Sequence, residues 1–206
     1  FEVSSLVAAA GYSTEQEFLQ LTADATPMHD LFPGATSLEG FLFPETYSLA
    51  KTATGEQILA AMLANFRQAF AGASEGHETD LNPYQSLILA SLIEKESGVP
   101  SERPLISAVF HNRLRRGMLL QCDPTTIYGM ILEGRYKGQI LLADLKDPHP
   151  YNTYVHGGLP PGPIASPGAE SLRAAFAPAD SEYIFFVANP GGVGELGEEA
   201  AELGVV

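Results

Sequence analysis

The chain has 206 residues, of which 45% are apolar and 17% are charged, which is enough for one sizeable globular domain or for one domain and a small lobe. Its formal net charge of −14 argues against a protein that binds nucleic acid through phosphate contacts. No apolar run reaches the roughly 20 residues of a membrane-spanning helix. The single cysteine, Cys122, excludes an internal disulfide.

Capping signals predict two helices within the first 72 residues. The segments 13–16 (STEQ) and 54–57 (TGEQ) each resemble a capping box in front of apolar residues at helical spacing. We expect the second of these helices to end at Gly72. The segment 40–44 (GFLFP) between them predicts a short strand.

The next two helices have the clearest ends. Asn82 is the expected N-cap of the first, and Gly98 is expected to end it in a left-handed conformation. Ser101 begins a second helix that we expect to end at Gly117. Together they predict a helical hairpin with Glu96 beside its connection.

The second half of the chain has a different composition. Residues 118–167 are rich in Gly, Pro, Tyr, Asn and Asp, and we expect them to form the wall of a binding site, with 123–130 (DPTTIYGM) as a turn. Ser166 and Pro167 are expected to cap a helix that reaches about Ala177. The segment 183–188 (YIFFVA) predicts a buried strand. The predicted fold class is α+β with helix in the majority, in which short strands and loops border a cleft.

Glu96 is the principal catalytic candidate. On a helical wheel its side chain falls within an apolar stripe, between Leu92 and Ile93, whereas Glu94 points elsewhere and is expected to face solvent. Burial against apolar groups and the negative end of the helix dipole both raise the pKa of a carboxyl group. A general acid that works near neutral pH requires such a pKa.

The alternative for Glu96 is a structural role as a buried acid paired with an arginine. Arg103 and Arg113 are the two candidate partners. Arg113 also belongs, with Arg115 and Arg116, to a basic patch that we interpret as a solvated helix end.

Other polar residues are candidates for substrate binding. Glu45, between aromatic residues, either borders a sugar-binding cleft or is an exposed residue at the end of a strand. Ser97 could orient the Glu96 carboxyl group or a substrate hydroxyl. Gln121 and Asp123 follow an apolar run, and Asp123 is also typical of a helix-capping turn.

Tyr151, Asn152 and Tyr154 offer two aromatic faces with an amide between them. This set suits stacking on sugar rings and hydrogen bonding to acetamido groups, although a packed loop would have the same composition. The sequence contains no metal-ligand motif, no GxSxG and no phosphate-binding loop, so we expect neither a metal ion nor a cofactor.

Several segments, in this order, resemble the endolytic murein transglycosylases of the YceG-like type. They are LEGFLFPETY, LILASLIEKESGVPSERPLISAVFHNRL, GMLLQCDPTTIYGM and YNTYVHGGLPPGPIASPG, followed by FFVA. The resemblance implies cleavage of the bond between N-acetylmuramic acid and N-acetylglucosamine in peptidoglycan, which leaves a 1,6-anhydromuramoyl end. It places the catalytic glutamate of the family at Glu96 and a catalytic domain at residues 38–190.

The resemblance also implies the setting of this domain. Family members begin with a membrane anchor and a LysM-like module, so residues 1–37 are expected to be a helical segment at the end of such a module. The implied location is the extracytoplasmic face of the cell membrane, and the implied partners are glycan strands, glycan-polymerising synthases and the division or elongation machinery. Residues 191–206 lack a histidine that the family usually has, and we expect an atypical, disordered tail.

Two other functions stay open from the sequence. One is a muramidase-type hydrolase in which Glu96 activates water with Glu45 as its partner. The other is a glycan-binding scaffold without catalytic activity.

Overall fold

The computed structural model describes residues 2–189 and 192–197, and within them the chain is mainly helical. The α-helices are α1 (Glu2–Ala9), α2 (Glu15–Thr22), α3 (Gly55–Ser74), α4 (Pro83–Glu96), α5 (Arg103–Arg115), α6 (Asp123–Leu132) and α7 (Ala169–Phe176). Short 3₁₀ helices are η1 (Thr26–Met28), η2 (Pro100–Glu102) and η3 (Asp144–Lys146). The helical majority of the predicted fold class is thus confirmed.

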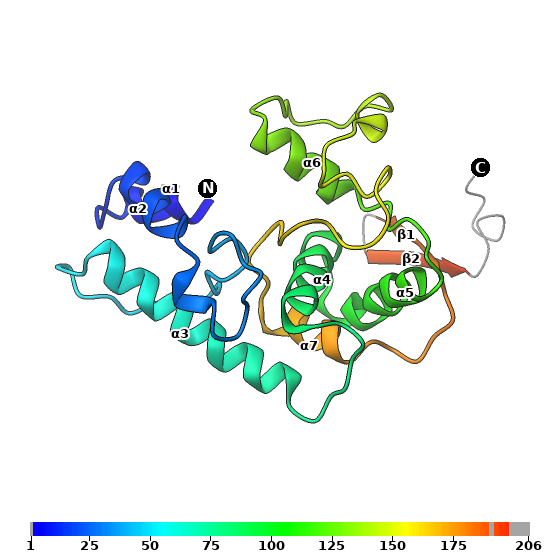
Figure 1. Ribbon diagram of the computed structural model, residues 1–206, viewed down its shortest axis with the longest axis horizontal. Coiled ribbons are helices and arrows are strands. Elements are labelled where there is room, and N and C mark those ends of the chain that lie inside the picture. Colours follow the sequence, from blue (N-terminus) through cyan, green and yellow to red (C-terminus); the bar gives the residue numbers. More distant parts are fainter. Residues whose placement is uncertain (1, 190–191, 198–206) are drawn as a thin grey trace.

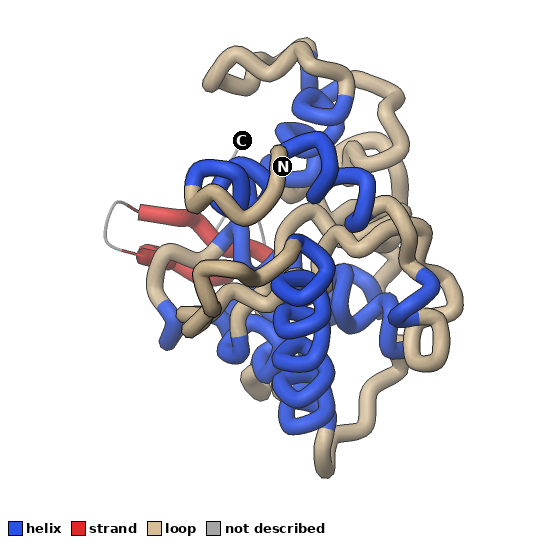
Figure 2. The backbone as a smooth tube through the Cα atoms, turned by 90° about the vertical axis from the view of Figure 1, so that its left-hand side faces the viewer, coloured by secondary structure: helices blue, strands red, loops and turns tan. Residues whose placement is uncertain are grey.

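The strand content of the described residues is one antiparallel pair, β1 (Phe185–Asn189) and β2 (Gly192–Gly197). This pair lies at one edge of the molecule (Figure 2). β1 confirms a strand over residues 185–188 of the predicted segment 183–188, but the predicted burial is wrong, because Phe185 and Phe186 are half-buried and Tyr183 is exposed. β2 occupies part of the segment expected to be a disordered tail, while residues 190–191 and 198–206 lie outside the described residues.

Helix α4 forms the centre of the fold. Every residue from Ser86 to Ile93 is buried, so α4 is covered on all sides and not along one stripe. Helices α5, α6 and α7 all contact it, and α6 stands above it in Figure 1. The predicted hairpin is confirmed, because α4 is joined to α5 through η2.

A group of phenylalanine rings connects the N-terminal segment to the helical body. Phe32 packs against Phe41 at a centroid distance of 5.0 Å and against Phe70 of α3 at 4.9 Å. Phe70 in turn packs against Phe176 of α7 at 5.3 Å. Residues before position 38 therefore share one core with the rest of the chain, and the domain boundary proposed there stays a prediction.

The strand predicted at 40–44 is wrong, because these residues form a turn. The amide of Phe41 donates to the carbonyl oxygen of Leu38 at 3.1 Å, and Gly40 has a φ of +88°. Phe41, Leu42 and Phe43 are all buried without the alternation of a strand. A short apolar run does not distinguish a strand from a buried turn.

The predicted helix ends are partly corrected. The first capping box is formed by Thr14 and Glu17, one residue later than predicted, whereas the boxes at Thr54 and Asn82 are confirmed. Helix α3 continues past Gly72 to Ser74.

The end of α4 also differs from the prediction. Ser97 is its C-cap with a φ of −101°, and Gly98 is not among the glycines with positive φ. The Ser97 hydroxyl donates to the carbonyl oxygen of Val99 at 2.7 Å, and Pro100 begins η2. The chain therefore leaves α4 in an extended conformation.

In the second half of the chain, two elements of the structure differ from the prediction. Residues 123–130 form most of helix α6 and not a turn. Gly129 fits there because a Cβ atom at this position would lie 2.5 Å from Nδ1 of His149. Helix α7 begins after Gly168, and its expected cap at Ser166–Pro167 is wrong.

Candidate active site

Glu96 is the last residue of α4, and its side chain is half-buried. Burial raises the pKa of the Glu96 carboxyl group above its usual value, and the nearby charge of Asp123 raises the same pKa. A hydrogen bond with the Cys122 thiol and the positive charge of Arg113 oppose this shift. The net shift is upward, which is the direction that a general acid requires.

The structural alternative for Glu96 required an arginine partner. Arg103 instead pairs with Glu94, at 3.4 Å between Nη2 and Oε1. Arg113 is buried, and its guanidinium donates to the carbonyl oxygens of Ile184 at 2.6 Å and Leu120 at 2.8 Å. No ion pair within the described part of the chain involves Glu96.

The placement of Arg113 corrects the predicted basic patch. Only 7% of Arg113 is exposed, and its guanidinium lies 4.9 Å from the ring centroid of Phe185. It therefore ties α5 to β1 and to the segment that leads into α6. Arg115 and Arg116 remain exposed.

Glu94 was expected to face solvent, and this expectation is wrong. Its Oε2 atom accepts hydrogen bonds from the amide of Gly168 at 3.0 Å and from the hydroxyl of Ser171 at 2.7 Å. Glu94 thus caps the N-terminus of α7 from another helix. The two acids of the Glu94-Lys95-Glu96 segment therefore have different surroundings. Glu94 is held by hydrogen bonds and by an ion pair with Arg103, whereas Glu96 takes part in no ion pair of the described residues.

The start of α6 brings polar groups to Glu96. Cys122 is the N-cap residue of α6, and its amide donates to the Thr153 hydroxyl oxygen at 3.0 Å. The Thr125 hydroxyl donates to the Cys122 carbonyl oxygen at 2.7 Å and lies 2.9 Å from the Thr153 hydroxyl. These buried threonines hold the thiol and Asp123 beside the end of α4.

Tyr154 belongs to the same group. Its hydroxyl donates to Oδ1 of Asp123 at 2.6 Å. Burial, followed by the bond to Asp123 and the charges of Glu96 and Cys122, raises the pKa of the Tyr154 phenol. Tyr154 is therefore a neutral hydrogen-bonding group near the Glu96 carboxyl group. Asp123 is the first residue of α6 and does not cap it.

Gln121 precedes this group in an unusual backbone conformation. It has a φ of +50°, the one positive φ of a non-glycine residue in the described chain. Its amide donates to the Thr153 carbonyl oxygen at 3.1 Å, and its side chain accepts from Nη1 of Arg113 at 3.3 Å. Such strain persists only where surrounding contacts enforce it, and it often accompanies functional sites.

The other predicted binding residues lie elsewhere or are engaged in local contacts. Asn152 is 1% exposed, and its amide donates to carbonyl oxygens of the 144–147 segment, with a 2.7 Å bond to that of Asp147. The Ser97 hydroxyl is engaged by the Val99 carbonyl oxygen. Glu45 is exposed and accepts from Nδ2 of Asn65 on α3 at 3.1 Å. Its hydrogen bond therefore directs it to α3 and not to Glu96.

Tyr151 lies in a second group, which sequence reasoning did not identify. Its ring packs against Tyr128 at a centroid distance of 4.9 Å. The nearby acid is Glu39, whose pKa is raised by burial and lowered in part by a hydrogen bond with Tyr128. The only sequence signal for Glu39 was an acid inside an apolar segment, which by itself predicts no role.

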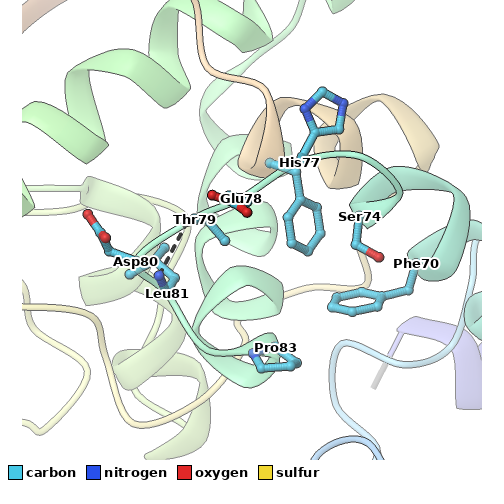
Figure 3. A pocket seen from close by; sticks show the side chains of 9 residues that line it. Phe70, Ser74, His77, Glu78, Thr79, Asp80, Leu81 and Pro83 are labelled. Carbon is cyan, nitrogen blue, oxygen red and sulfur yellow. Dashed lines mark hydrogen bonds between the residues drawn. The ribbon is translucent and has the colours of Figure 1, made fainter.

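Two adjoining hollows lie at a different end of the helical body. The larger has a volume of 590 Å³ and is bordered by the end of α3, the end of α7 and the segment before α4 (Figure 3). Phe70, His77 and Phe176 are among its lining residues. Neither hollow contains any of the predicted site residues.

Two further findings concern the described residues alone. They contain no group of three or more His, Cys, Asp and Glu side chains that could hold a metal ion. None of their helices combines the length and the apolar character needed to cross a membrane.

The chain is similar to known bacterial proteins. It is 40% identical over 159 residues to the endolytic murein transglycosylase of Bacillus subtilis (strain 168), a match that covers 75% of this chain and 43% of the relative. It is 35% identical over 169 residues to the endolytic murein transglycosylase of Streptococcus pneumoniae serotype 2 (strain D39 / NCTC 7466), covering 74% and 28%. The chain therefore spans less than half the length of these curated relatives.

Structure and family comparisons agree with this similarity. A crystal structure of a yceG-like protein from Listeria monocytogenes matches with a TM-score of 0.79 at 30% identity, covering 98% of this chain and 71% of that chain. A model of the YceG-like family matches residues 2–199. This chain belongs to the YceG-like family.

Proposed function

We propose that this chain is the catalytic part of an endolytic lytic transglycosylase of peptidoglycan, with Glu96 as its single general acid and base. The observation that carries the proposal is the Glu96 carboxyl group, which is half-buried, has a raised pKa and takes part in no ion pair of the described chain. The names of the relatives from Bacillus and Streptococcus support the substrate class.

The proposed reaction uses the Glu96 carboxyl group twice. The protonated group gives its proton to the glycosidic oxygen while the bond from that oxygen to the anomeric carbon of N-acetylmuramic acid breaks. The resulting carboxylate takes the proton of the C6 hydroxyl of the same sugar, and O6 forms a new bond to the anomeric carbon. No water is consumed, and Glu96 ends the cycle protonated.

An intramolecular nucleophile explains why one carboxyl group suffices. The C6 hydroxyl is already attached to the reacting sugar, so neither a bound water nor a second carboxylate is required. This differs from the paired carboxylates of most glycosidases. The exposed position of Glu45, bound to Asn65, supports the same distinction.

Tyr154 and Asp123 are the groups best placed to assist Glu96. The neutral Tyr154 phenol can exchange hydrogen bonds with the acetamido group or a hydroxyl of the sugar at the cleaved bond. Asp123 holds this phenol and raises the pKa of Glu96. In this proposal Ser97, Gln121 and Asn152 hold the backbone around the site in place and do not bind the substrate.

The Glu96→Gln variant tests this function. We expect product formation from purified glycan strands to fall at least about a hundredfold, because an amide cannot donate the proton that the leaving group needs. Mass spectrometry of wild-type products should show 1,6-anhydro ends. Products heavier by one water would favour the hydrolase, and strand binding without new ends would favour the scaffold.

The location of the protein is a proposal of the same kind. Because peptidoglycan lies outside the cytoplasmic membrane, we expect the full-length protein to act at the extracytoplasmic face. An association with glycan-polymerising synthases stays a prediction.

A further inference from the structure

A second group of polar side chains takes no part in the proposed reaction. It consists of Glu39, Tyr84, Tyr128 and Tyr151, and we refer to it as the Glu39 cluster. All four side chains are half-buried. The three aromatic rings pack with one side against the hydrophobic core.

The members of the Glu39 cluster converge. The Tyr128 and Tyr151 rings are tilted by 53° at a centroid distance of 4.9 Å. The Glu39 carboxyl group lies close enough to the Tyr128 hydroxyl for that hydroxyl to lower its raised pKa in part. The hydroxyl oxygens of Tyr151 and Tyr84 lie 2.9 and 3.2 Å from the place that a Cβ atom of Gly162 would occupy. Both phenol groups therefore lie beside Gly162, which has no side chain to displace them.

Two hydroxyl groups of the Glu39 cluster remain free to bind a ligand. Within the described part of the chain, the hydroxyls of Tyr84 and Tyr151 form no hydrogen bond with another protein group. Neither hydroxyl is among the fully buried polar atoms without a partner, so both stay accessible to solvent. Partly accessible phenols beside a carboxyl group present both donors and acceptors to a ligand.

The cluster lies at a defined distance from Glu96. Tyr84 is the second residue of α4 and Glu96 the last, so twelve residues of helix separate their Cα atoms by about 18 Å. On α6, Asp123 of the Glu96 group and Tyr128 of the Glu39 cluster are five residues apart, about 7.5 Å along the axis. The two groups are therefore held by the same pair of helices, with α6 above α4 (Figure 1).

We propose that the Glu39 cluster is a second glycan-binding subsite, which holds a sugar of the same strand at a position remote from the cleaved bond. The proposal rests on the function proposed for Glu96. One sugar ring cannot touch both groups, so each contacts a different sugar. The ligand class is an N-acetylated, hydroxyl-rich polysaccharide strand, recognised by the Glu39 carboxyl group and the phenol hydroxyls, with an aromatic face for stacking.

Such a subsite has a consequence for the cutting pattern. Strands that extend from Glu96 to the Glu39 cluster gain contacts that short fragments lack. Because these contacts are made equally in the ground state and the transition state, they lower KM and leave kcat unchanged. The subsite would then give the endolytic cutting of the proposed function a basis in named residues.

The test compares two substrates with two variants. Tyr84→Phe removes one hydroxyl and Glu39→Gln replaces the carboxyl group with an amide, and both keep the side-chain shape. On long glycan strands we expect each variant to raise KM by about fivefold with kcat unchanged, the effect of one lost hydrogen bond. On oligosaccharides just long enough to span the cleaved bond, we expect no change.

Tyr183→Phe is the matched control, because Tyr183 is an exposed tyrosine outside both groups. It should behave as the wild type on both substrates. An equal loss on long and short substrates would assign the cluster a structural role and overturn the proposal. Unchanged kinetics of both variants on long strands would also overturn it.

Binding separates this proposal from the function of Glu96. In the Glu96→Gln background, Tyr84→Phe should weaken the Kd for long strands by about fivefold. If protein with Glu96 intact binds long strands, depends on Tyr84 for that binding and yet forms no anhydro ends, the result would contradict the proposed function and support the subsite. An unchanged Kd would overturn the subsite even where Glu96 proves essential.

Discussion

Glu96 performs the proposed reaction only while its carboxyl group holds a proton, and two neighbours act on that proton in opposite directions. The charge of Asp123 raises the pKa of Glu96, whereas the hydrogen bond with the Cys122 thiol lowers it. Burial is the largest cause of the net upward shift. The alkaline limb of the pH profile of kcat/KM reports the pKa of such a general acid in the free enzyme.

The two neighbours can be tested as a pair. Asp123→Asn removes a negative charge, so we expect the alkaline limb to move to lower pH. Cys122→Ala removes a hydrogen bond that stabilises the carboxylate, so the limb should move to higher pH. Asp180→Asn, which removes an exposed charge elsewhere, should leave the profile unchanged. Shifts of both site variants in the same direction would contradict this account of the Glu96 pKa.

The raised pKa of Glu96 also affects stability. A carboxyl group whose pKa is higher in the folded state destabilises that state as pH rises, and the full penalty is reached above the folded pKa. It amounts to about 1.4 kcal/mol when the folded and unfolded pKa values differ by 1. Below the pKa of the unfolded chain the penalty is absent. We therefore expect Glu96→Gln to be more stable than the wild type at neutral pH, with the difference vanishing near pH 4. Denaturant unfolding at several pH values measures it, and a Gln variant that is less stable at neutral pH would contradict the prediction.

At the scale of elements, the end of α4 determines where α7 begins. No side chain of the segment before α7 caps it. The Glu94 carboxylate supplies the acceptor from a distant part of the chain, while its other oxygen pairs with Arg103. One residue thus joins α4, α5 and α7 two positions away from the candidate acid.

Glu94→Ala should lower the free energy of unfolding by about 2–3 kcal/mol, because it removes a helix cap and leaves Arg103 without its partner. Glu94→Gln keeps an acceptor oxygen and should lose less. Lys95→Ala, an exposed neighbour on the same helix, is the control and should change stability by no more than about 0.5 kcal/mol. Equal effects of Glu94→Ala and Lys95→Ala in denaturant unfolding would exclude the capping role.

At the scale of the whole molecule, segments far apart in the chain come into direct contact. Gly40 has a φ of +88°, and a Cβ atom there would lie 2.6 Å from Cβ of Pro163. The turn at 40–44 therefore packs against the loop that also contains Gly162, next to the Glu39 cluster. Any side chain at position 40 would displace this loop.

Gly40→Ala should destabilise the fold through both backbone strain and the contact with Pro163, by about 2–4 kcal/mol in total. Gly76→Ala is a matched control, because Gly76 has a similar φ of +73° and no atom lies within 4 Å of the place that its Cβ would occupy. It should cost only the strain, about 1–2 kcal/mol. Comparable losses in thermal or denaturant unfolding would show that the contact with Pro163 is unimportant.

Local features of the sequence were sufficient for most helices. The capping boxes at Thr54 and Asn82 and the hairpin of α4 and α5 follow from signals within a few residues. Helical periodicity did not separate Glu96 from Glu94, because α4 is covered on all sides and both side chains are half-buried. Residue-level prediction therefore succeeded where the cause was local.

The tertiary structure alone decided which polar groups meet. The cap that Glu94 provides to α7, the burial of Arg113 and the grouping of Glu39 with three tyrosines all join residues that are distant in the chain. The turn at 40–44 and helix α6 likewise depend on contacts with the rest of the molecule. Periodicity describes one element at a time, whereas these features arise from packing between elements, which a single sequence does not display.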